Sequence, residues 1–522
     1  MKRLFALTSL LCLALSNVVA ADKPNIIFIL CDDLGYGDVK CLNPEGKIAT
    51  PNFDKLAAEG MKFTDAHSGS SVCTPTRYGV VTGRYAWRSK LQSSVLGGLS
   101  PRLIEQGRMT VASMLKAQGY STHCIGKWHL GMDWVRKGEV TELGIESAAQ
   151  VNNVDYTKPI ANGPTTVGFD TYFGISASLD MVPYCFIEND HVVANPTETM
   201  KLAMNGSGGK MSFTREGPGS PGFRGEDVLP MAHKSAPCRS SRRRRRRPFS
   251  IYMPLNSPHT PILPSEKWQG KSGISLYADF VMETDDAIGQ VMRATEENGI
   301  AKDTLIVVTS DNGCSPQANF PELIAKGHNP SYNMRGHKAD IFDGGHRVPF
   351  IVRWPAKVKG GQTTSQITCL TDFMATAAEI VSVKLPDNAA EDSFSFLPVL
   401  LGESSKALRQ SVIHHSINGS FALREGDWKI ELCAGSGGWS DPRPGSPGEQ
   451  GLPDTQLYNL KDDIAEKDNL QSSEPAIVAK MTAELEKIVT DGRSTPGAPQ
   501  KNAVEVVIRK KTPAAKPKKK AK

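Results

Sequence analysis

Continuous runs of apolar residues predict strands that are buried on both faces. The clearest runs are 24–31, 249–255 and 304–309, and weaker ones cover 120–125 and 347–354. A strand inside a parallel sheet that is covered by helices on both faces has no polar positions to alternate with its apolar ones. The chain is therefore expected to build a large sheet with a layer on each side.

Segments with helical spacing of their apolar residues lie between and after these runs: 51–60, 110–119, 276–298 and 371–382. Strands that alternate with helices indicate a doubly wound, mostly parallel α/β sheet. A length of 522 residues exceeds what one compact core usually holds, so a large domain with a smaller one is expected.

The pattern changes after about residue 400, where short segments predict antiparallel strands and one helix: 411–417, 420–424, 427–433 and 475–489. This arrangement is typical of a small α+β unit. We therefore expect an α/β domain over 21–400 and a C-terminal α+β subdomain over 401–508.

Both ends of the chain are expected to lie outside the fold. Lys2 and Arg3 precede an apolar run that ends in small residues near Ala20, and this run is too short to span a membrane. It predicts a signal peptide over 1–20 and an exported protein, periplasmic or secreted, and the rest of the chain offers no membrane span. The Lys-, Pro- and Ala-rich tail over 509–522 is expected to be disordered.

The net charge of +6 comes from local basic runs. Without the 16 positive charges of Arg242–Arg247, the tail and the N-terminus, the body carries about −10, so its charge does not imply nucleic-acid binding. The arginine run can be a solvated loop, an anion-binding patch or a reading-frame error. The ten cysteines form no CxxC pair or dense framework, and their spacing therefore predicts neither a zinc site nor a disulfide scaffold.

Polar residues follow the carboxyl ends of four predicted strands: Asp32, Asp33, Lys127, His129, His259, Asp311 and Asn312. Ligands of open α/β sheets bind beyond these strand ends. A single aspartate after a strand is more often a turn or helix cap. Two such pairs crowd three carboxylates together, and these would repel one another without a cation. Hard oxygen donors suit Ca²⁺ or Mg²⁺ better than zinc.

The segment Cys73-Thr74-Pro75-Thr76-Arg77 predicts the start of a helix, with Thr74 as its cap and Pro75 as its first residue. Cys73 would then lie just before a helix N-terminus, which favours an anion. Arg77 adds a fixed positive charge. From these residues alone, Cys73 can be a thiolate nucleophile, a disulfide partner or a small buried residue.

The same segment matches the C-x-P-x-R signature of type I sulfatases, whose cysteine is oxidised to formylglycine. The resemblance is to the arylsulfatase A and N-acetylgalactosamine-6-sulfatase types and runs from Pro24 to about Asn469. The matching segments, in the family's order, are KPNIIFILCDDLGYGD, TPNFDKLAAEGMKFTDAHSGSSVCTPTRYGVVTGRY, GKWHLG, SPHTP, SDNG and GHKADIFDGGHRVP. The resemblance implies an alkaline-phosphatase-like fold, sulfate-ester hydrolysis, one Ca²⁺ per chain and formylglycine that a maturation enzyme makes from Cys73.

The resemblance also implies roles for individual residues. The calcium ligands would be Asp32, Asp33, Asp311 and Asn312, completed by an oxygen of the modified Cys73. Arg77 and Lys127 would hold the formylglycine hydrate, with His129 as its base. His259 and Lys338 would bind the sulfate and assist the leaving oxygen, and Ser178 would contact the sulfate.

The substrate is not encoded in any of these motifs. An exported enzyme of this kind is expected to act on a sulfated carbohydrate, by analogy with the family. Two alternatives stay open: a phosphonate or phosphodiester hydrolase with the same modified cysteine, and a non-catalytic binder of sulfated glycans with Cys73 unmodified. Specificity is expected in the loops 84–108, 132–166 and 434–454.

Overall fold

The computed structural model describes residues 23–138, 151–204, 214–235, 247–403 and 406–510. The predicted signal peptide, most of the arginine run and the tail beyond residue 510 lie outside the described residues. Within the described part, no helix has the length and apolar character needed to cross a membrane.

The main sheet has ten strands in the order β13-β2-β12-β11-β1-β10-β4-β5-β6-β7. The central strands β11, β1, β10, β4 and β5 run parallel to one another, whereas β12, β6 and β7 introduce antiparallel pairs. The predicted mixed, mostly parallel sheet is therefore confirmed. In sheet order the strands are Gln362–Thr364, Met61–Phe63, Phe350–Arg353, Thr304–Ser310, Asn25–Cys31, Phe249–Pro254, Ser121–Lys127, Thr171–Ile175, Ile187–Glu188 and His191–Val192.

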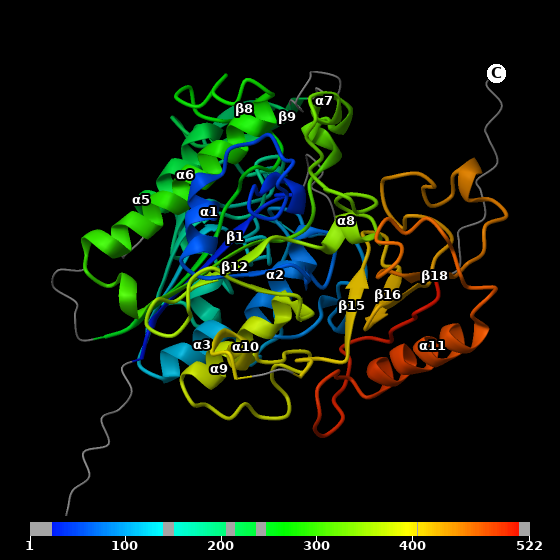
Figure 1. Ribbon diagram of the computed structural model, residues 1–522. Coiled ribbons are helices and arrows are strands. Elements are labelled where there is room, and N and C mark those ends of the chain that lie inside the picture. Colours follow the sequence, from blue (N-terminus) through cyan, green and yellow to red (C-terminus); the bar gives the residue numbers. More distant parts are fainter. Residues whose placement is uncertain (1–22, 139–150, 205–213, 236–246, 404–405, 511–522) are drawn as a thin grey trace, which may run out of the picture.

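Strand β1 (Asn25–Cys31) shows how the sheet separates two cores. Ile27 and Ile29 pack with helices α1 (Pro51–Ala58) and α6 (Leu276–Glu297), and α5 (Val228–Lys234) joins this layer. Ile26, Phe28 and Leu30 belong to the opposite core, which contains α3 (Val111–Ala117) and α9 (Phe373–Ile380). Because successive side chains of a strand point to opposite faces, an uninterrupted apolar run fills both cores. Figure 1 shows the two groups of helices on opposite sides of the sheet.

A second, antiparallel sheet follows the main one, with the order β15-β16-β17-β18. Its strands are Ser411–His415, Phe421–Glu425, Trp428–Glu431 and Gln456–Asn459. Helix α11 (Pro475–Thr490) packs on it through Met481, Leu485 and Ile488 (Figure 1). The smaller C-terminal α+β unit is thus confirmed, although β18 was not expected. The boundary at residue 400 stays a prediction.

The remaining elements are short. They are β3 (Ala66–His67) paired with β14 (Thr368–Cys369), the hairpin β8 (Glu198–Ala203) and β9 (Thr214–Gly219), and helices α2 (Cys73–Thr82), α7 (Phe320–Ala325), α8 (Asp343–His346) and α10 (Leu397–Leu400). Among them, α2, α8 and β3 carry residues of the sites described below.

Candidate active site

The carboxyl ends of β1, β11 and β4 bring the predicted polar residues to one edge of the sheet. Asp32 and Asp33 follow β1, Asp311 and Asn312 follow β11, and Lys127 is the last residue of β4. All of these side chains are buried, as are Cys73, Arg77, His129, Ser178, His259 and Lys338. The expectation that the strand ends converge is therefore met in the structure.

Oxygen donors of four residues face one another at this edge. The backbone N–H of Asp33, at a left-handed φ of 65°, donates to Asp311 Oδ1 at 3.2 Å. Asn312 Nδ2 donates to Asp33 Oδ1 at 2.7 Å, and its Oδ1 is buried without a hydrogen-bond partner among the described residues. One ligand atom each of Asp32, Asp33, Cys73 and His259 lie within 4.8 Å of one another. A buried amide oxygen without a donor, beside three carboxylates, fits a hard cation.

Three cationic side chains alternate with these carboxylates. Arg77 donates to Asp311 Oδ2 from Nη2 at 2.7 Å and from Nε at 3.2 Å. Lys127 Nζ lies 2.6 Å from Asp32 Oδ2, and Lys338 Nζ lies 2.7 Å from Asp33 Oδ1. Buried charges persist only when each is paired and hydrogen-bonded. The same cations can offset negative charge on a bound anion.

The three carboxylates do not share the same electrostatic environment. Burial raises the pKa of Asp311 to about 7, and the negative charge of Asp32 adds to this shift. Burial also acts on Asp32, but Lys127, His259 and Arg77 outweigh it and hold the pKa of Asp32 well below its usual range. The protein charges alone therefore leave one carboxylate of the group poorly compensated, as expected of a cation site.

Cys73 is the first residue of helix α2, and Val72 is the residue before it. The prediction that Thr74 caps this helix is wrong, because its hydroxyl accepts instead from the backbone N–H of Leu96 at 3.1 Å. Cys73 Sγ lies 3.6 Å from Asp32 Oδ1. Burial raises the pKa of this thiol above its usual range despite Lys127 and Lys338 nearby. The environment thus disfavours a plain thiolate nucleophile.

The two histidines of the site are held in different ways. His129 Nε2 bonds the Leu96 carbonyl at 2.6 Å, and its Nδ1 is buried without a hydrogen-bond partner among the described residues. The backbone turns here, because β4 ends at Lys127 and His129 has a left-handed φ of 55°. Burial, Lys127 and Arg77 lower the pKa of His129 well below its usual range. It is therefore a neutral ring with one nitrogen available to accept a proton.

His259 lies close to the carboxylates of Asp32 and Asp33. Its Nδ1 bonds the Thr260 carbonyl at 2.5 Å, and its Nε2 lies 3.6 Å from Asp33 Oδ2. Burial and then Lys338 lower the pKa of His259. The Ser178 hydroxyl is buried and has no hydrogen-bond partner among the described residues. Buried polar groups are usually hydrogen-bonded, so this hydroxyl is available to a bound ligand.

Two residues that the sequence did not single out support this site. Leu96 uses its backbone twice, as acceptor for His129 and as donor to Thr74. The Tyr277 hydroxyl, from the buried face of α6, donates to Asp38 Oδ2 at 2.5 Å and lies 3.3 Å from the Asp33 carbonyl. Neither carries a sequence signal, because one acts through its backbone and the other lies within an ordinary amphipathic helix.

The fold and the site define an α/β hydrolase of anionic esters with a buried acidic cluster that could hold a metal ion. The chain belongs to the sulfatase family, whose sequence profile matches residues 24–383, and it is a sulfuric ester hydrolase.

The chain is 30% identical over 505 residues to an N-acetylgalactosamine-6-O-sulfatase of Bacteroides thetaiotaomicron, over 90% of this chain and 94% of that protein. It is also 30% identical over 481 residues to human arylsulfatase A, over 88% of this chain and 86% of that protein. A solved structure from work on glycosaminoglycan metabolism by B. thetaiotaomicron superposes with a TM-score of 0.73 at 30% identity, covering 89% of this chain and 99% of that one.

Proposed function

We propose that this sulfatase removes sulfate from a carbohydrate, with a Ca²⁺ ion and a formylglycine made from Cys73. The observation that carries the proposal is the placement of Cys73 among the candidate cation ligands, with its Sγ 3.6 Å from Asp32 Oδ1 and within 4.8 Å of a ligand atom of Asp33 and of His259. Asp32, Asp33, Asp311 and Asn312 would hold the ion, since all offer hard oxygens and the Asn312 oxygen has no other partner in the described part of the chain.

A formylglycine hydrate supplies two hydroxyls on one carbon, one to attack sulfur and one to expel the sulfate afterwards. Arg77, Lys127 and Lys338 offset the charge of the transferring group from positions fixed by Asp311, Asp32 and Asp33. His259 delivers a proton to the leaving alcohol, and His129 accepts one through Nδ1 when sulfate is released. Ser178 contacts the sulfate.

A pocket of about 480 Å³ fits a carbohydrate beside this machinery. It is lined by Leu96, whose carbonyl holds His129, by Asn152 and Asp180, and by Arg215 and Glu216 of the β8–β9 hairpin. Leu96 and Asn152 belong to two of the loops expected to set specificity. Polar and charged groups around a concave site suit a hydroxylated ligand.

The third expected loop, 434–454, approaches from the other side. The Ser436 carbonyl accepts from Ile341 N at 2.7 Å, and the backbone N–H of Trp439 donates to Asp340 at 2.7 Å. These contacts place the loop beside the segment that carries Lys338.

Activity on a panel of defined sulfated sugars, among them 6-sulfated N-acetylgalactosamine, tests the proposed function. Each sulfate ester is paired with the matching phosphodiester. We expect sulfate release from at least one sugar and little from the paired phosphodiesters. Preference for the phosphodiesters would replace this function with the alternative hydrolase, and binding without turnover would indicate a glycan binder.

Formylglycine at position 73 is the first specific prediction. When the protein is produced with a maturation enzyme, the tryptic peptide ending at Arg77 should be lighter by about 18 Da than its thiol form, as conversion of cysteine to an aldehyde requires. Peptides that carry Cys31 and Cys124, also buried free thiols, serve as internal controls. A fully active enzyme with an intact thiol at position 73 would refute the mechanism.

Alanine substitutions of the two histidines should impair different steps of the reaction. His259→Ala should slow alkyl sulfates about 100-fold more than an activated aryl sulfate, because only the sugar alcohol needs a proton on leaving. His129→Ala should release the alcohol in the first turnover with both substrates and retain the sulfate. Single-turnover kinetics that follow alcohol and sulfate separately check both outcomes. Equal losses for the two substrates in His259→Ala, with no retained sulfate in His129→Ala, would show that the roles are misassigned.

A further inference from the structure

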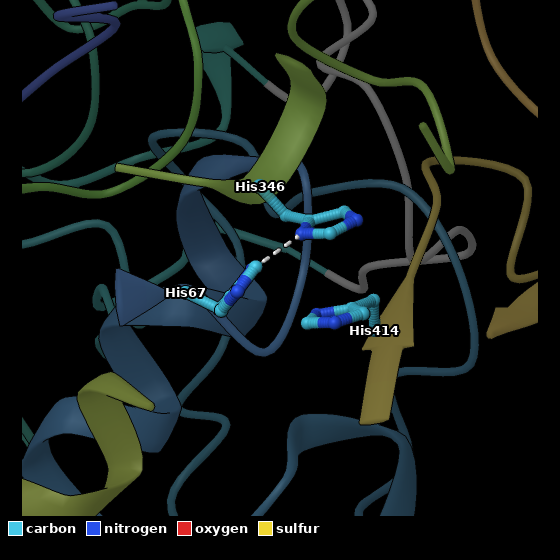
Figure 2. Close-up of side chains that lie close together, drawn as sticks. All are labelled: His67, His346 and His414. Carbon is cyan, nitrogen blue, oxygen red and sulfur yellow. Dashed lines mark hydrogen bonds between the residues drawn. The ribbon is translucent and has the colours of Figure 1, made fainter. Parts of the chain in front are cut away.

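Three buried histidines meet outside the proposed active site. His67 comes from β3, His346 from α8 and His414 from β15 of the C-terminal sheet. All three side chains are fully buried, and one ring nitrogen of each lies within 4.8 Å of the other two. Figure 2 shows the rings gathered around one space, each from a different segment. None of them has a role in the proposed hydrolysis.

The outer hydrogen bonds of two rings fix where their protons lie. His67 Nε2 is 2.7 Å from the Asp65 carboxylate, and His346 Nε2 is 3.0 Å from the Ile341 carbonyl. Both partners only accept, so each Nε2 must carry the hydrogen. A neutral imidazole has one N–H, and both Nδ1 atoms are therefore lone pairs. These two atoms nevertheless lie 3.1 Å apart (Figure 2).

Arg424 also approaches His67 Nε2, at 3.3 Å. The same guanidinium nitrogen lies closer to Asp65, at 2.7 Å. Asp65 is thus the better acceptor for Arg424, and the proton of His67 Nε2 still points to the carboxylate.

The third ring presents another lone pair. His414 Nδ1 donates to the Ser68 carbonyl at 3.3 Å, so its Nε2 carries no proton. That nitrogen is buried without a hydrogen-bond partner among the described residues. Three lone pairs therefore share one buried space, and the described residues supply no donor to it. Leaving such groups unpaired is costly.

Either an additional proton or a metal ion can satisfy these nitrogens. An additional proton would make one ring cationic. His67 would be the favoured ring, because it lies beside the Asp65 carboxylate. Asp65, however, already pairs with Arg347 at 3.1 Å and with Arg424 at 2.7 Å, and Lys429 lies 3.0 Å from the adjacent Asp343. The carboxylates nearest the rings are thus already paired with basic groups and have little remaining charge to hold an additional proton. A metal ion forms bonds to the neutral nitrogens themselves and does not depend on that charge.

We propose that His67, His346 and His414 bind a first-row transition metal ion, with Zn²⁺ as the ion that three imidazoles suit best. Asp65 and Ile341 orient the rings of His67 and His346 through their outer nitrogens, as carboxylates and carbonyls commonly do for metal-bound histidines. The site uses no cysteine, which is why cysteine spacing gave no sign of it. Its ligands join the first strand of the C-terminal sheet to two segments of the large domain.

Ion binding requires one ring to move. The rings of His346 and His414 are stacked, with centroids 3.6 Å apart and planes inclined by 8°. Lone pairs lie in the ring plane, so two parallel rings do not point at one ion. His414 has the longest of the three outer hydrogen bonds, and it is the ring that turns. The ion then links residues 67, 346 and 414, so its binding stabilises the folded chain.

The test uses the full chain with its active-site cation in place and Zn²⁺ or Co²⁺ as the probe. We expect one transition metal ion per chain, a Tm that rises with zinc concentration, and visible Co²⁺ absorption of tetrahedral intensity. His414→Phe keeps a stacked ring without a ligand nitrogen and should weaken zinc binding at least about 100-fold. His415→Phe is the matched control, because His415 is buried next in the strand and its ring packs on Phe421; it should bind zinc normally.

Asp311→Ala distinguishes the histidine site from the active site, because this variant should retain the Co²⁺ signal while losing turnover. If His414→Phe fails to fold, His346→Phe provides the same comparison. Absence of a transition metal from the wild-type protein after equilibration with micromolar zinc would overturn the proposal. Equal zinc binding by His414→Phe and wild type would also overturn it.

Discussion

Asp311→Ala should remove the divalent cation from the active site and lower turnover by about 10³-fold or more. Asp311 is fully buried and bonds both the Asp33 backbone and Arg77. Its loss deletes one oxygen donor and leaves the Arg77 guanidinium without its strongest partner. Arg77 is then expected to turn toward Asp32, which lies 3.4 Å away. In that position its guanidinium would compete with the ion for the Asp32 carboxylate. Metal analysis of the folded protein and kcat on a sulfated sugar give the two measurements.

Asp392→Ala is a matched control for this change. Asp392 is also fully buried and pairs with an arginine, Arg88, at 2.8 Å and 2.9 Å. Removing either aspartate takes the main carboxylate partner away from a buried guanidinium, which costs about 3–5 kcal/mol of stability. Asp392→Ala should lower Tm but keep its cation and its kcat per folded molecule. If Asp311→Ala kept full metal content and turnover, the proposed cation site would be wrong.

The main sheet could be predicted where burial imposes a simple pattern. The segment 26–31 is apolar throughout because β1 lies between two cores, and such a run is visible without a structure. Strands β6 and β7 escaped prediction because each has two residues, too few for any periodicity. Strand β18 has only four residues and follows a loop rich in Gly, Ser and Pro, so its sequence pattern was too short to predict a strand.

The candidate active site was predictable because strand ends in a parallel sheet meet at one edge. Asp32 and Asp311 follow adjacent strands, so their proximity follows from topology. The turn at His129 was not predictable, since a left-handed φ outside glycine depends on what surrounds it. The histidine cluster left no sequence signal, because residues 67, 346 and 414 meet only through tertiary packing.

Cys73→Ser should abolish turnover while leaving the site able to react once. The serine hydroxyl would occupy the first position of α2, beside Asp32 and within the reach of Arg77, Lys127 and Lys338, whose positions the carboxylates fix. It can attack sulfur, forming a serine sulfate ester as the S–O bond to the alcohol breaks and the alcohol takes up a proton. A serine has no second hydroxyl on the same carbon to expel that sulfate. Loss of kcat should therefore be about 10⁴-fold or more, as for removal of other catalytic nucleophiles.

The expected signature is a single turnover followed by a stable adduct. Intact mass after mixing with substrate should rise by about 80 Da, the mass of one transferred SO₃ group, and the adduct should map to the peptide ending at Arg77. Cys73→Ala keeps the fold and the cations but offers no nucleophile, so it should show neither adduct nor turnover. Comparison of the two variants distinguishes the contribution of the reacting atom at position 73 from that of the binding site around it. Steady turnover by Cys73→Ser, or an equal adduct in Cys73→Ala, would place the nucleophile elsewhere and contradict the proposed role of this residue.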